Sequence, residues 1–399
     1  MRADDFFRDD LARREANGLR RYLRTVDGAQ DARVTIAGRS VISLCSNNYL
    51  GLANHPALIE AACRAARDDG VGAGASRLIS GSMRSHQQLE ERLAAFKGTE
   101  ACLLFNSGYH ANVGTIAALV GQGDAVFSDA LNHASLVDGC RLSRAAVHVY
   151  PHANVGALEE MLRRCVGRRR LIVTDSIFSM DGDAAPLAEI CALAERYDAM
   201  VMVDEAHATG IVGPRGAGLV EALGLGDRVT VQMGTLGKAL GGFGAYVAGS
   251  AALIGFLVNT ARTLIFTTAL PPPVVAAAAA ALTIVENEPE RRQRVRQNAT
   301  RLRAGLHGVG WAVEATQGHI IPLHIGDAGT TMRVSEALLE YGVLAQGIRP
   351  PTVPPGTERI RATVMATHTD ADIDAAIDAF ALAAPAHHAG LARRVRTGA

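Results

Sequence analysis

Short apolar runs alternate with amphipathic helical segments along the middle of the chain. Between residues 55 and 285, helix-like stretches such as 157–166 and 187–197 separate the apolar runs. The runs that predict strands are 101–105, 125–128, 146–150, 171–174, 200–203, 229–232 and 245–248. Such alternation predicts an α/β fold, with a mostly parallel central sheet flanked by helices.

Both ends of the chain depart from this pattern. The N-terminal segment combines a charged helix over 1–25 with a hairpin, whose strands, 32–36 and 40–44, flank Ala37-Gly38-Arg39. From Glu286 the chain becomes dense in Glu and Arg, which predicts a connecting helix before further strand and helix signals. The sequence thus divides into an N-terminal arm and hairpin (1–54), a large domain (55–285), a smaller α/β C-terminal domain (286–384) and a flexible tail (385–399).

Composition narrows the classes of function. The chain has 399 residues, 48% of them hydrophobic, and its formal net charge is zero. It therefore lacks the broad positive field of a nucleic-acid-binding protein, and its apolar content argues against disorder. The alanine-rich run 274–285 is too short for a membrane span, so we expect a buried helix and no membrane partner. Six scattered cysteines without a C-x-x-C pair predict neither disulfides nor a metal site, and the acidic, polar start is no secretory signal. We expect a cytoplasmic protein.

Polar clusters follow several of the predicted strands. In an open parallel sheet, ligands bind beyond the carboxyl ends of the strands, so such clusters would form one site. The clusters are Asn106-Ser107-Gly108-Tyr109, Asn132-His133, 176–183, Asp204-Glu205-Ala206-His207 and 234–238.

Two of these clusters carry the most specific chemistry. Asp204 ends an apolar run, where a carboxylate needs a cationic or hydrogen-bonding partner, and His207 can face the same ligand. A helix-capping aspartate is the alternative. Lys238 lies in a glycine-rich turn, where loss of water lowers an amine's pKa and favours a Schiff base. Asp-Glu-Ala-His also spells a helicase box, but no phosphate-binding loop precedes it, which argues against an ATPase. The pattern predicts pyridoxal 5'-phosphate (PLP).

Four further residues fit such a site. Free amides at the N-terminus of the apolar helix predicted from about Ala111 can bind phosphate, and Gly108 before it permits close backbone approach, although an ordinary helix cap would look the same. His133 could stack on a flat ring, and Ser179 could donate to a ring substituent; a cap histidine and a turn serine are the alternatives. Arg349 lies in a proline-rich, stiff loop suited to gripping a carboxylate, unless it is a surface arginine.

Taken together, these segments resemble the α-oxoamine synthases, PLP-dependent transferases of fold type I, over about residues 10–382. The likeness covers 46–52 (Ser-Asn-Asn-Tyr-Leu-Gly-Leu), 72–77, 132–135, 178–183, 204–210 and the turn around Lys238. It implies a homodimer with the active site at the subunit interface, where Thr267 or Thr268 would reach the phosphate of the opposite subunit.

The resemblance also implies roles at the cofactor. Lys238, His133, Asp204 and His207 would be the catalytic residues. Lys238 would bind the cofactor covalently and move protons at the substrate α-carbon, and Asp204 would keep the ring nitrogen protonated. His207 and Ser179 would bind the ring oxygen, and His133 would stack on the ring and contact substrate. The phosphate would be held by the amides of Gly108 and Tyr109 and the hydroxyl of Thr235.

Substrate contacts follow in the same way. Arg349 and Asn47 would grip the carboxylate of the amino acid. Thr352 and an N-terminal arginine would contact the acyl group; alignment favours Arg20, with Arg21 adjacent.

Three segments, 265–272, 348–354 and 365–368, point to one member of the family. That member is an acyltransferase that condenses L-alanine with a pimeloyl thioester in biotin biosynthesis. The sequence leaves open whether the thiol is coenzyme A or a carrier protein, and how strictly alanine is preferred. A sibling synthase that condenses glycine with acetyl-CoA is the alternative, and a non-catalytic binding protein of the same fold is a remote one.

Overall fold

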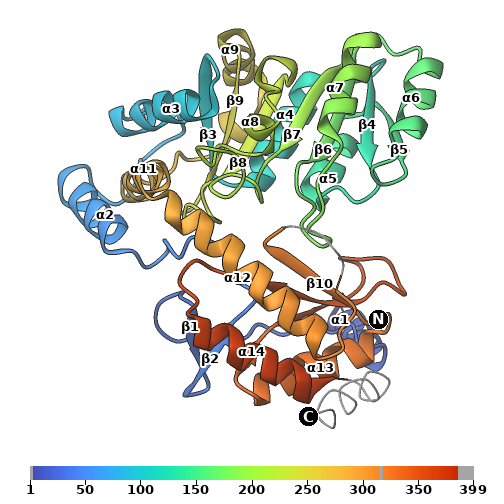
Figure 1. Ribbon diagram of the computed structural model, residues 1–399. Helices are drawn as coiled ribbons and strands as arrows, with labels where there is room; N and C mark the ends of the chain where they lie inside the picture. The colour runs from blue at the N-terminus through green and yellow to red at the C-terminus, as the bar shows by residue number, and fades with distance from the viewer. Residues whose placement is uncertain (1–2, 314–317, 385–399) are drawn as a thin grey trace. The chain divides into compact units, whose positions relative to one another are not determined.

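The computed structural model describes residues 3–313 and 318–384, which form two compact units (Figure 1). The larger unit comprises Asn47–Ser179 and Asp183–Gln293, and the smaller comprises the other described residues. The chain crosses briefly into the smaller unit at Met180–Gly182. The predicted flexible tail, 385–399, lies outside the described residues.

A seven-stranded sheet forms the centre of the larger unit (Figure 1). Its spatial order is β3-β9-β8-β7-β6-β4-β5, and β9 runs antiparallel to both of its neighbours while the other pairs are parallel. The strands are β3 (Ala101–Phe105), β4 (Ala125–Asp129), β5 (Ala146–Tyr150), β6 (Arg170–Asp175), β7 (Met200–Asp204), β8 (Val231–Thr235) and β9 (Ala245–Gly249). The predicted α/β fold with a mostly parallel sheet is confirmed.

Helices cover both faces of this sheet because alternate strand residues point to opposite sides. In β6, Leu171 and Val173 join one apolar cluster and Ile172 joins the other. The helical segments are α2 (Pro56–Asp68), α3 (Arg84–Lys97), α4 (Gly108–Leu119), α5 (Ala134–Ser143), α6 (Val155–Arg164), α7 (Leu187–Arg196), α8 (Leu219–Ala222), η1 (Gly226–Arg228), α9 (Ala251–Thr260), α10 (Arg262–Ile265) and α11 (Pro272–Asn287).

Strand β8 begins and ends later than the apolar pattern predicts. The predicted run was 229–232, whereas β8 extends to Thr235 and includes Gly234, a residue that strands usually disfavour. A Cβ at Gly234 would lie 2.4 Å from the Tyr246 ring on β9, so glycine is needed for the two strands to pair. The packing of β8 against β9, which a single sequence does not reveal, therefore determines where β8 ends.

The alanine-rich segment forms α11, and several of its side chains are buried, as predicted. Within the described residues, no helix is both long and apolar enough to cross a membrane.

Two small sheets belong to the smaller unit. The predicted N-terminal hairpin is confirmed: β1 (Arg33–Ile36) pairs antiparallel with β2 (Arg39–Ser43), and β11 (Val343–Leu344) adds a parallel strand. The second sheet has the order β10-β13-β12, formed by β10 (Ile320–His324), β13 (Arg359–Thr363) and β12 (Gln346–Ile348). The helices are α1 (Ala3–Ala16), α13 (Ala328–Glu340) and α14 (Asp370–Ala383), while α12 (Pro289–Gly308) starts in the larger unit. Helix α1 ends well before the predicted residue 25, and Gly18 then adopts a positive φ of 64°.

Candidate active site

The carboxyl ends of β7 and β8 bring Lys238 and His207 together. The Lys238 Nζ lies 2.8 Å from the His207 Nε2, although 31 residues separate them in sequence. His207 is buried, and Lys238 is half-buried in the turn after β8. The polar clusters that follow β7 and β8 therefore meet at one edge of the sheet.

Tyr49 fixes the other side of the His207 ring. Its hydroxyl lies 2.7 Å from the His207 Nδ1 and donates to the Asn47 Oδ1 at 3.0 Å. Because a hydroxyl carries one hydrogen, this arrangement makes the His207 Nδ1 the donor to Tyr49. The His207 Nε2 is then an acceptor, matched to the ammonium of Lys238. Tyr49 was not among the predicted site residues, although its segment, 46–52, was noted.

Asp204 ends β7 as a buried carboxylate with only 3% of its surface exposed. One oxygen accepts from the Asn112 side-chain amide at 2.7 Å, and the other accepts from the Ala206 backbone amide at 2.8 Å. The second contact closes a turn: residues 206–211 form turns and no helix begins there, so the helix-capping alternative is wrong. Both donors are neutral, so the carboxylate still favours a cation beside it.

A second buried carboxylate lies on the neighbouring strand. Asp175 ends β6 and pairs in register with Asp204. Burial raises the pKa of Asp175 well above its ordinary value, and the nearby Asp204 charge raises it further. The raised pKa favours the neutral form of Asp175 and places the negative charge of the pair on Asp204.

His133 follows β4 and caps α5. Its ring Nδ1 accepts from the Ser135 backbone amide at 3.3 Å, and its own backbone amide donates to the Asp175 Oδ2 at 2.7 Å. The residue as a whole remains exposed, so the ring is accessible to a ligand. Loss of water to the surrounding protein lowers the pKa of His133, and Lys238 lowers it too, against the opposing charge of Asp204. His133 is thus both a cap histidine and a member of this cluster.

Gly108 and Tyr109 begin α4, directly after β3. The Ser107 hydroxyl caps the helix by accepting from the His110 amide at 3.2 Å. The first backbone amides of a helix point away from its body, where they can bind a phosphate. The Tyr109 side chain points elsewhere, since its hydroxyl donates to Asp138 at 2.7 Å.

Two threonines lie near this end of the sheet. Thr235 ends β8, where its hydroxyl donates to the Gly244 carbonyl and accepts from the Gly237 amide. The Thr267 hydroxyl accepts from the Asn106 side chain at 3.0 Å, and Asn106 immediately precedes Ser107, the cap of α4.

Ser179 lies in a loop held by a charged histidine. His152 contacts Asp129 through its Nδ1 at 2.9 Å and Asp183 through its Nε2 at 2.8 Å. Hydrogen bonds to Asp129 and then Asp183 raise the pKa of His152 to about 10, so the ring is positively charged at neutral pH. This cation fixes the end of the loop four residues after Ser179.

An internal ion pair fixes the segment that carries Asp204 and His207. Lys97, at the end of α3, contacts the Glu205 carboxylate, and both side chains are fully buried. Glu205 also accepts from the Val220 amide at 3.0 Å. The sequence contains two lysines, Lys97 and Lys238. Because Lys97 is buried in the ion pair with Glu205, Lys238 is the one that a ligand can reach.

The chemistry of the cluster fits PLP. The buried Asp204 carboxylate, which accepts from two neutral amides, suits the protonated ring nitrogen of PLP, and the partly accessible Lys238 suits its aldehyde. The amide-rich start of α4 suits its phosphate. Among the described residues there is no group of three or more His, Cys, Asp or Glu side chains that could hold a metal ion.

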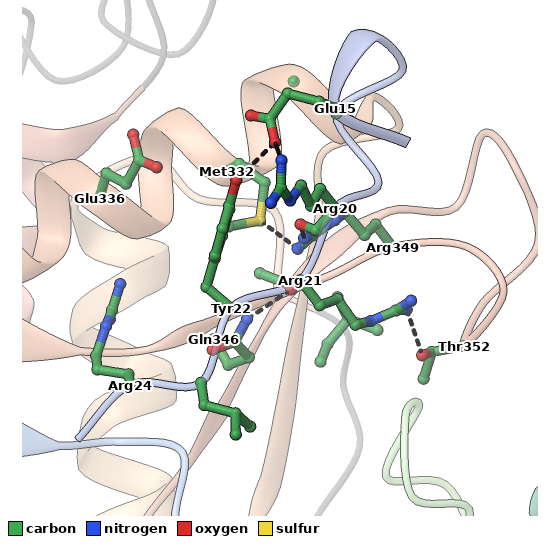
Figure 2. Close-up of a pocket in the computed structure, with 15 residues that line it drawn as sticks. Glu15, Arg20, Arg21, Tyr22, Arg24, Met332, Glu336, Gln346, Arg349 and Thr352 are labelled. Carbon is green, nitrogen blue, oxygen red and sulfur yellow. Dashed lines mark hydrogen bonds and ion pairs between the residues drawn. The ribbon is translucent and has the colours of Figure 1, made fainter. Parts of the chain in front are cut away.

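The predicted substrate residues Arg20, Arg349 and Thr352 line a cavity of about 580 Å³ in the smaller unit (Figure 2). Arg349 is buried, and its guanidinium contacts the Met332 sulfur and the Arg20 carbonyl, while its Nε has no hydrogen-bond partner. Two further arginines, Arg21 and Arg24, line the same cavity. It is therefore a positively charged cavity.

Figure 2 separates the roles of the two adjacent N-terminal arginines. The Arg21 guanidinium donates to the Thr352 hydroxyl at 3.4 Å and to the Pro350 carbonyl at 3.2 Å. Arg20 instead pairs with Glu15 at 3.4 Å and lies over the Tyr22 ring. Sequence alignment favours Arg20, whereas the contact with Thr352 favours the adjacent Arg21.

Known proteins resemble this chain over almost its whole length. The family model for class I and II aminotransferases matches residues 39–380. The 8-amino-7-oxononanoate synthase of Geotalea daltonii is 52% identical over 379 residues, covering 94% of this chain and 96% of the relative. That of Geobacter sulfurreducens is 53% identical over 375 residues, covering 93% and 96%.

Solved structures share the fold. Serine palmitoyltransferase from S. paucimobilis, with bound PLP-myriocin aldimine, superposes with a TM-score of 0.91 at 32% identity and covers 98% of each chain.

Proposed function

Because the chain belongs to the class I and II aminotransferase family and, within it, to the 8-amino-7-oxononanoate synthases, we propose how its residues carry out that reaction. The chain is a PLP-dependent acyltransferase of biotin biosynthesis. It condenses L-alanine with a pimeloyl thioester and releases 8-amino-7-oxononanoate, carbon dioxide and the free thiol. The observation that carries the mechanism is the contact of 2.8 Å between the Lys238 amine and His207, close to a buried carboxylate.

Lys238 is the residue we assign to covalent attachment of the cofactor and to proton transfer at the alanine α-carbon. When bound, PLP supplies an aldehyde that links to amines and a ring that draws electron density from the reacting carbon. Asp204 keeps the ring nitrogen protonated, since its negative charge is buried and favours a cation. Gly108 and Tyr109 bind the phosphate through backbone amides, together with Thr235.

His207 orients the amine of Lys238. Its Nε2 accepts from the ammonium, and its Nδ1 is held by Tyr49, which is held in turn by Asn47. These linked hydrogen bonds keep the His207 imidazole in one tautomer. We assign Ser179 to the ring oxygen together with His207, and His133 to stacking on the ring.

We propose that Arg349 and Asn47 bind the alanine carboxylate. A buried guanidinium with one unpaired nitrogen suits a carboxylate acceptor. Asn47 lies in the larger unit, and its share of this assignment rests on the family resemblance.

The terminal carboxylate of the pimeloyl group is the ligand we assign to Arg21 and Thr352. We expect Arg21→Ala to raise the KM for pimeloyl-CoA at least about ten-fold, because a charge-assisted hydrogen bond contributes roughly 1.5–3 kcal/mol. The KM for alanine should change little. Steady-state kinetics with each substrate varied in turn would measure both.

Arg20→Ala is the matched control for this variant, since Arg20 pairs with Glu15 instead of Thr352. It should raise the KM for pimeloyl-CoA less than Arg21→Ala does. A second control uses heptanoyl-CoA, which lacks the terminal carboxylate: Arg21→Ala and the native enzyme should handle it alike. An equal loss with both thioesters would remove the carboxylate from this assignment.

We propose that the enzyme acts as a homodimer in the cytoplasm. Large apolar side chains are exposed on the larger unit, including Phe266 at 70% and Ile79 at 80%, and a second copy would cover them. Thr267, next to Phe266, would then reach the phosphate of the opposite subunit. The six cysteines are free, in keeping with a reducing compartment.

The substrates can be tested in one assay matrix. Purified holoenzyme would be given L-alanine, glycine or L-serine, each with pimeloyl-, acetyl- or palmitoyl-CoA, and thiol release and product mass would be followed. We expect kcat/KM to be highest for alanine with pimeloyl-CoA. Preference for glycine with acetyl-CoA, or for serine with palmitoyl-CoA, would assign the chain a sibling reaction instead.

A further inference from the structure

A hydrogen-bonded chain of neutral side chains joins His133 to Asp204 inside the larger unit. The Asn112 Nδ2, on α4, lies 2.7 Å from the Asp204 Oδ2 and 2.9 Å from the Ser135 hydroxyl on α5. The Ser135 hydroxyl lies 2.7 Å from the His133 Nδ1. Asn112 and Ser135 are both buried, so these contacts are shielded from water.

Counting hydrogens fixes the direction of every bond in this chain. The Asn112 amide nitrogen carries two hydrogens, one for Asp204 and one for Ser135. The Ser135 oxygen therefore accepts from Asn112, and its single hydrogen is directed to the His133 Nδ1. The same Nδ1 also accepts from the Ser135 backbone amide. A nitrogen that accepts two hydrogen bonds carries no proton, so the proton of His133 lies on its Nε2.

The reverse orientation of the Asn112 amide is unfavourable. It would direct the carbonyl oxygen at the Asp204 carboxylate, placing two acceptors against each other. In the observed orientation the Asn112 Oδ1 has no hydrogen-bond partner, although it is buried. Leaving that acceptor unpaired has a cost, which indicates that the contacts of the Nδ2 matter more.

Close approach of two helices brings Ser135 and Asn112 together. Gly139, one turn after Ser135 on α5, faces α4: a Cβ there would lie 3.2 Å from the Asn112 carbonyl and 3.0 Å from Ile116. A larger residue at 139 would push the helices apart and lengthen the contact between Ser135 and Asn112. The backbone geometry thus supports the same hydrogen-bonded chain.

The charged groups around His133 have opposing effects on its pKa. Asp204 and Asp138 favour the imidazolium, whereas Lys238 and the loss of water favour the neutral ring. Asp175 accepts from the backbone amide of His133, and its raised pKa favours its neutral form. The two donors at the Nδ1 act in favour of the neutral ring, since an imidazolium would direct a third hydrogen at them.

We propose that Asn112 and Ser135 are positioning residues that hold His133 as the neutral Nε2–H imidazole and couple its orientation to Asp204. The consequence for catalysis rests on the function proposed above. A neutral ring stacked on the cofactor does not repel the positive ring nitrogen that Asp204 stabilises, whereas an imidazolium would. One amide would thereby serve the carboxylate and the stacking histidine together.

Histidine NMR of the full-length holoenzyme tests the tautomer without any substrate. With ¹⁵N-labelled histidine, His133 is assigned by comparison with His133→Gln, and its two ring nitrogens are followed through a pH titration. We expect the native Nδ1 to be unprotonated and the ring to stay neutral below its ordinary pKa. In Ser135→Ala and Asn112→Leu, the pKa of His133 should rise. A protonated Nδ1 in the native enzyme, or unchanged titration in both variants, would overturn the proposal.

Two buried neighbours provide matched controls. Ser143→Ala removes a hydroxyl from the same helix as Ser135, one that donates to the Cys140 carbonyl and accepts from the Ala145 backbone amide, away from His133. Thr115→Val removes a buried hydroxyl from the same helix as Asn112, one turn away, which makes no hydrogen bond. Neither control should shift the His133 titration, and a shift as large as in Ser135→Ala would contradict the specific role.

Kinetics then separate this proposal from the proposed function. We expect Ser135→Ala to lower kcat about five- to ten-fold with little change in the KM for alanine, the effect of one hydrogen bond. Ser135→Thr, which keeps the hydroxyl, should restore both kcat and the titration. If the NMR result holds but alanine and pimeloyl-CoA do not react, the proposed function fails and the tautomer assignment stands. An unchanged kcat with an active native enzyme would overturn the catalytic part of this inference.

Discussion

Lys238→Ala is expected to abolish condensation, with a loss of kcat of at least about 1,000-fold, because no other amine can take its role. The sequence contains one other lysine, Lys97, and that side chain is fully buried against Glu205. Borohydride reduction of the native holoenzyme should fix the cofactor on the peptide that contains Lys238. In Lys238→Ala, the mass increase and the visible absorbance of the linked cofactor should both disappear.

Lys238→Arg distinguishes the chemistry of the amine from its charge. Arginine keeps a cation beside His207, but a guanidinium is never deprotonated in proteins and so cannot act as a nucleophile. We therefore expect Lys238→Arg to be as inactive as Lys238→Ala, while its thermal stability stays closer to that of the native enzyme. Peptide mapping provides an internal control, since Lys97 should remain unlabelled in every sample. Persistent labelling of Lys238→Ala would place the covalent link on another residue.

Local sequence patterns predicted the large sheet and the residues at its edge. Apolar runs located the strands to within a few residues because buried strands in a parallel sheet are almost continuously hydrophobic. The rule that ligands bind at the carboxyl ends of strands then grouped Lys238, His207, Asp204 and His133. In the structure Lys238 contacts His207, and Asn112 with Ser135 links Asp204 to His133. The resemblance added roles that spacing alone could not supply.

The partners of these residues could not be predicted from local patterns. Asn112 looks like one polar residue in an apolar helix, and Asp204, its partner, lies 92 residues later in the sequence. Tyr49 reaches His207 across 158 residues. Such contacts depend on how helices and loops pack over the sheet, and that packing is set by the whole chain. The choice between Arg20 and Arg21 is similar, because one residue of register decides which guanidinium reaches Thr352.

Asp204→Asn is expected to leave the cofactor bound and to lower kcat at least about 100-fold, the loss typical when a preorganised electrostatic group is removed. Lys238 and the start of α4 are untouched, so the covalent link and the phosphate site remain. The new amide has no negative charge to hold a proton on the ring nitrogen. It also accepts only one of the two hydrogen bonds that Asn112 and Ala206 donate. Stopped-flow absorbance with alanine would separate slow chemistry from weak binding.

Asp175→Asn is the matched control, because this carboxyl group ends the neighbouring strand at the paired position. Its folded-state pKa is raised, which favours the uncharged form, so we expect an amide to replace it with little electrostatic change. The amide oxygen can still accept from the His133 backbone amide. We therefore expect kcat of Asp175→Asn to stay within about ten-fold of the native value, far above that of Asp204→Asn. Equal losses in the two variants would mean that both carboxyl groups act as charges and would contradict the assignment of the single negative charge to Asp204.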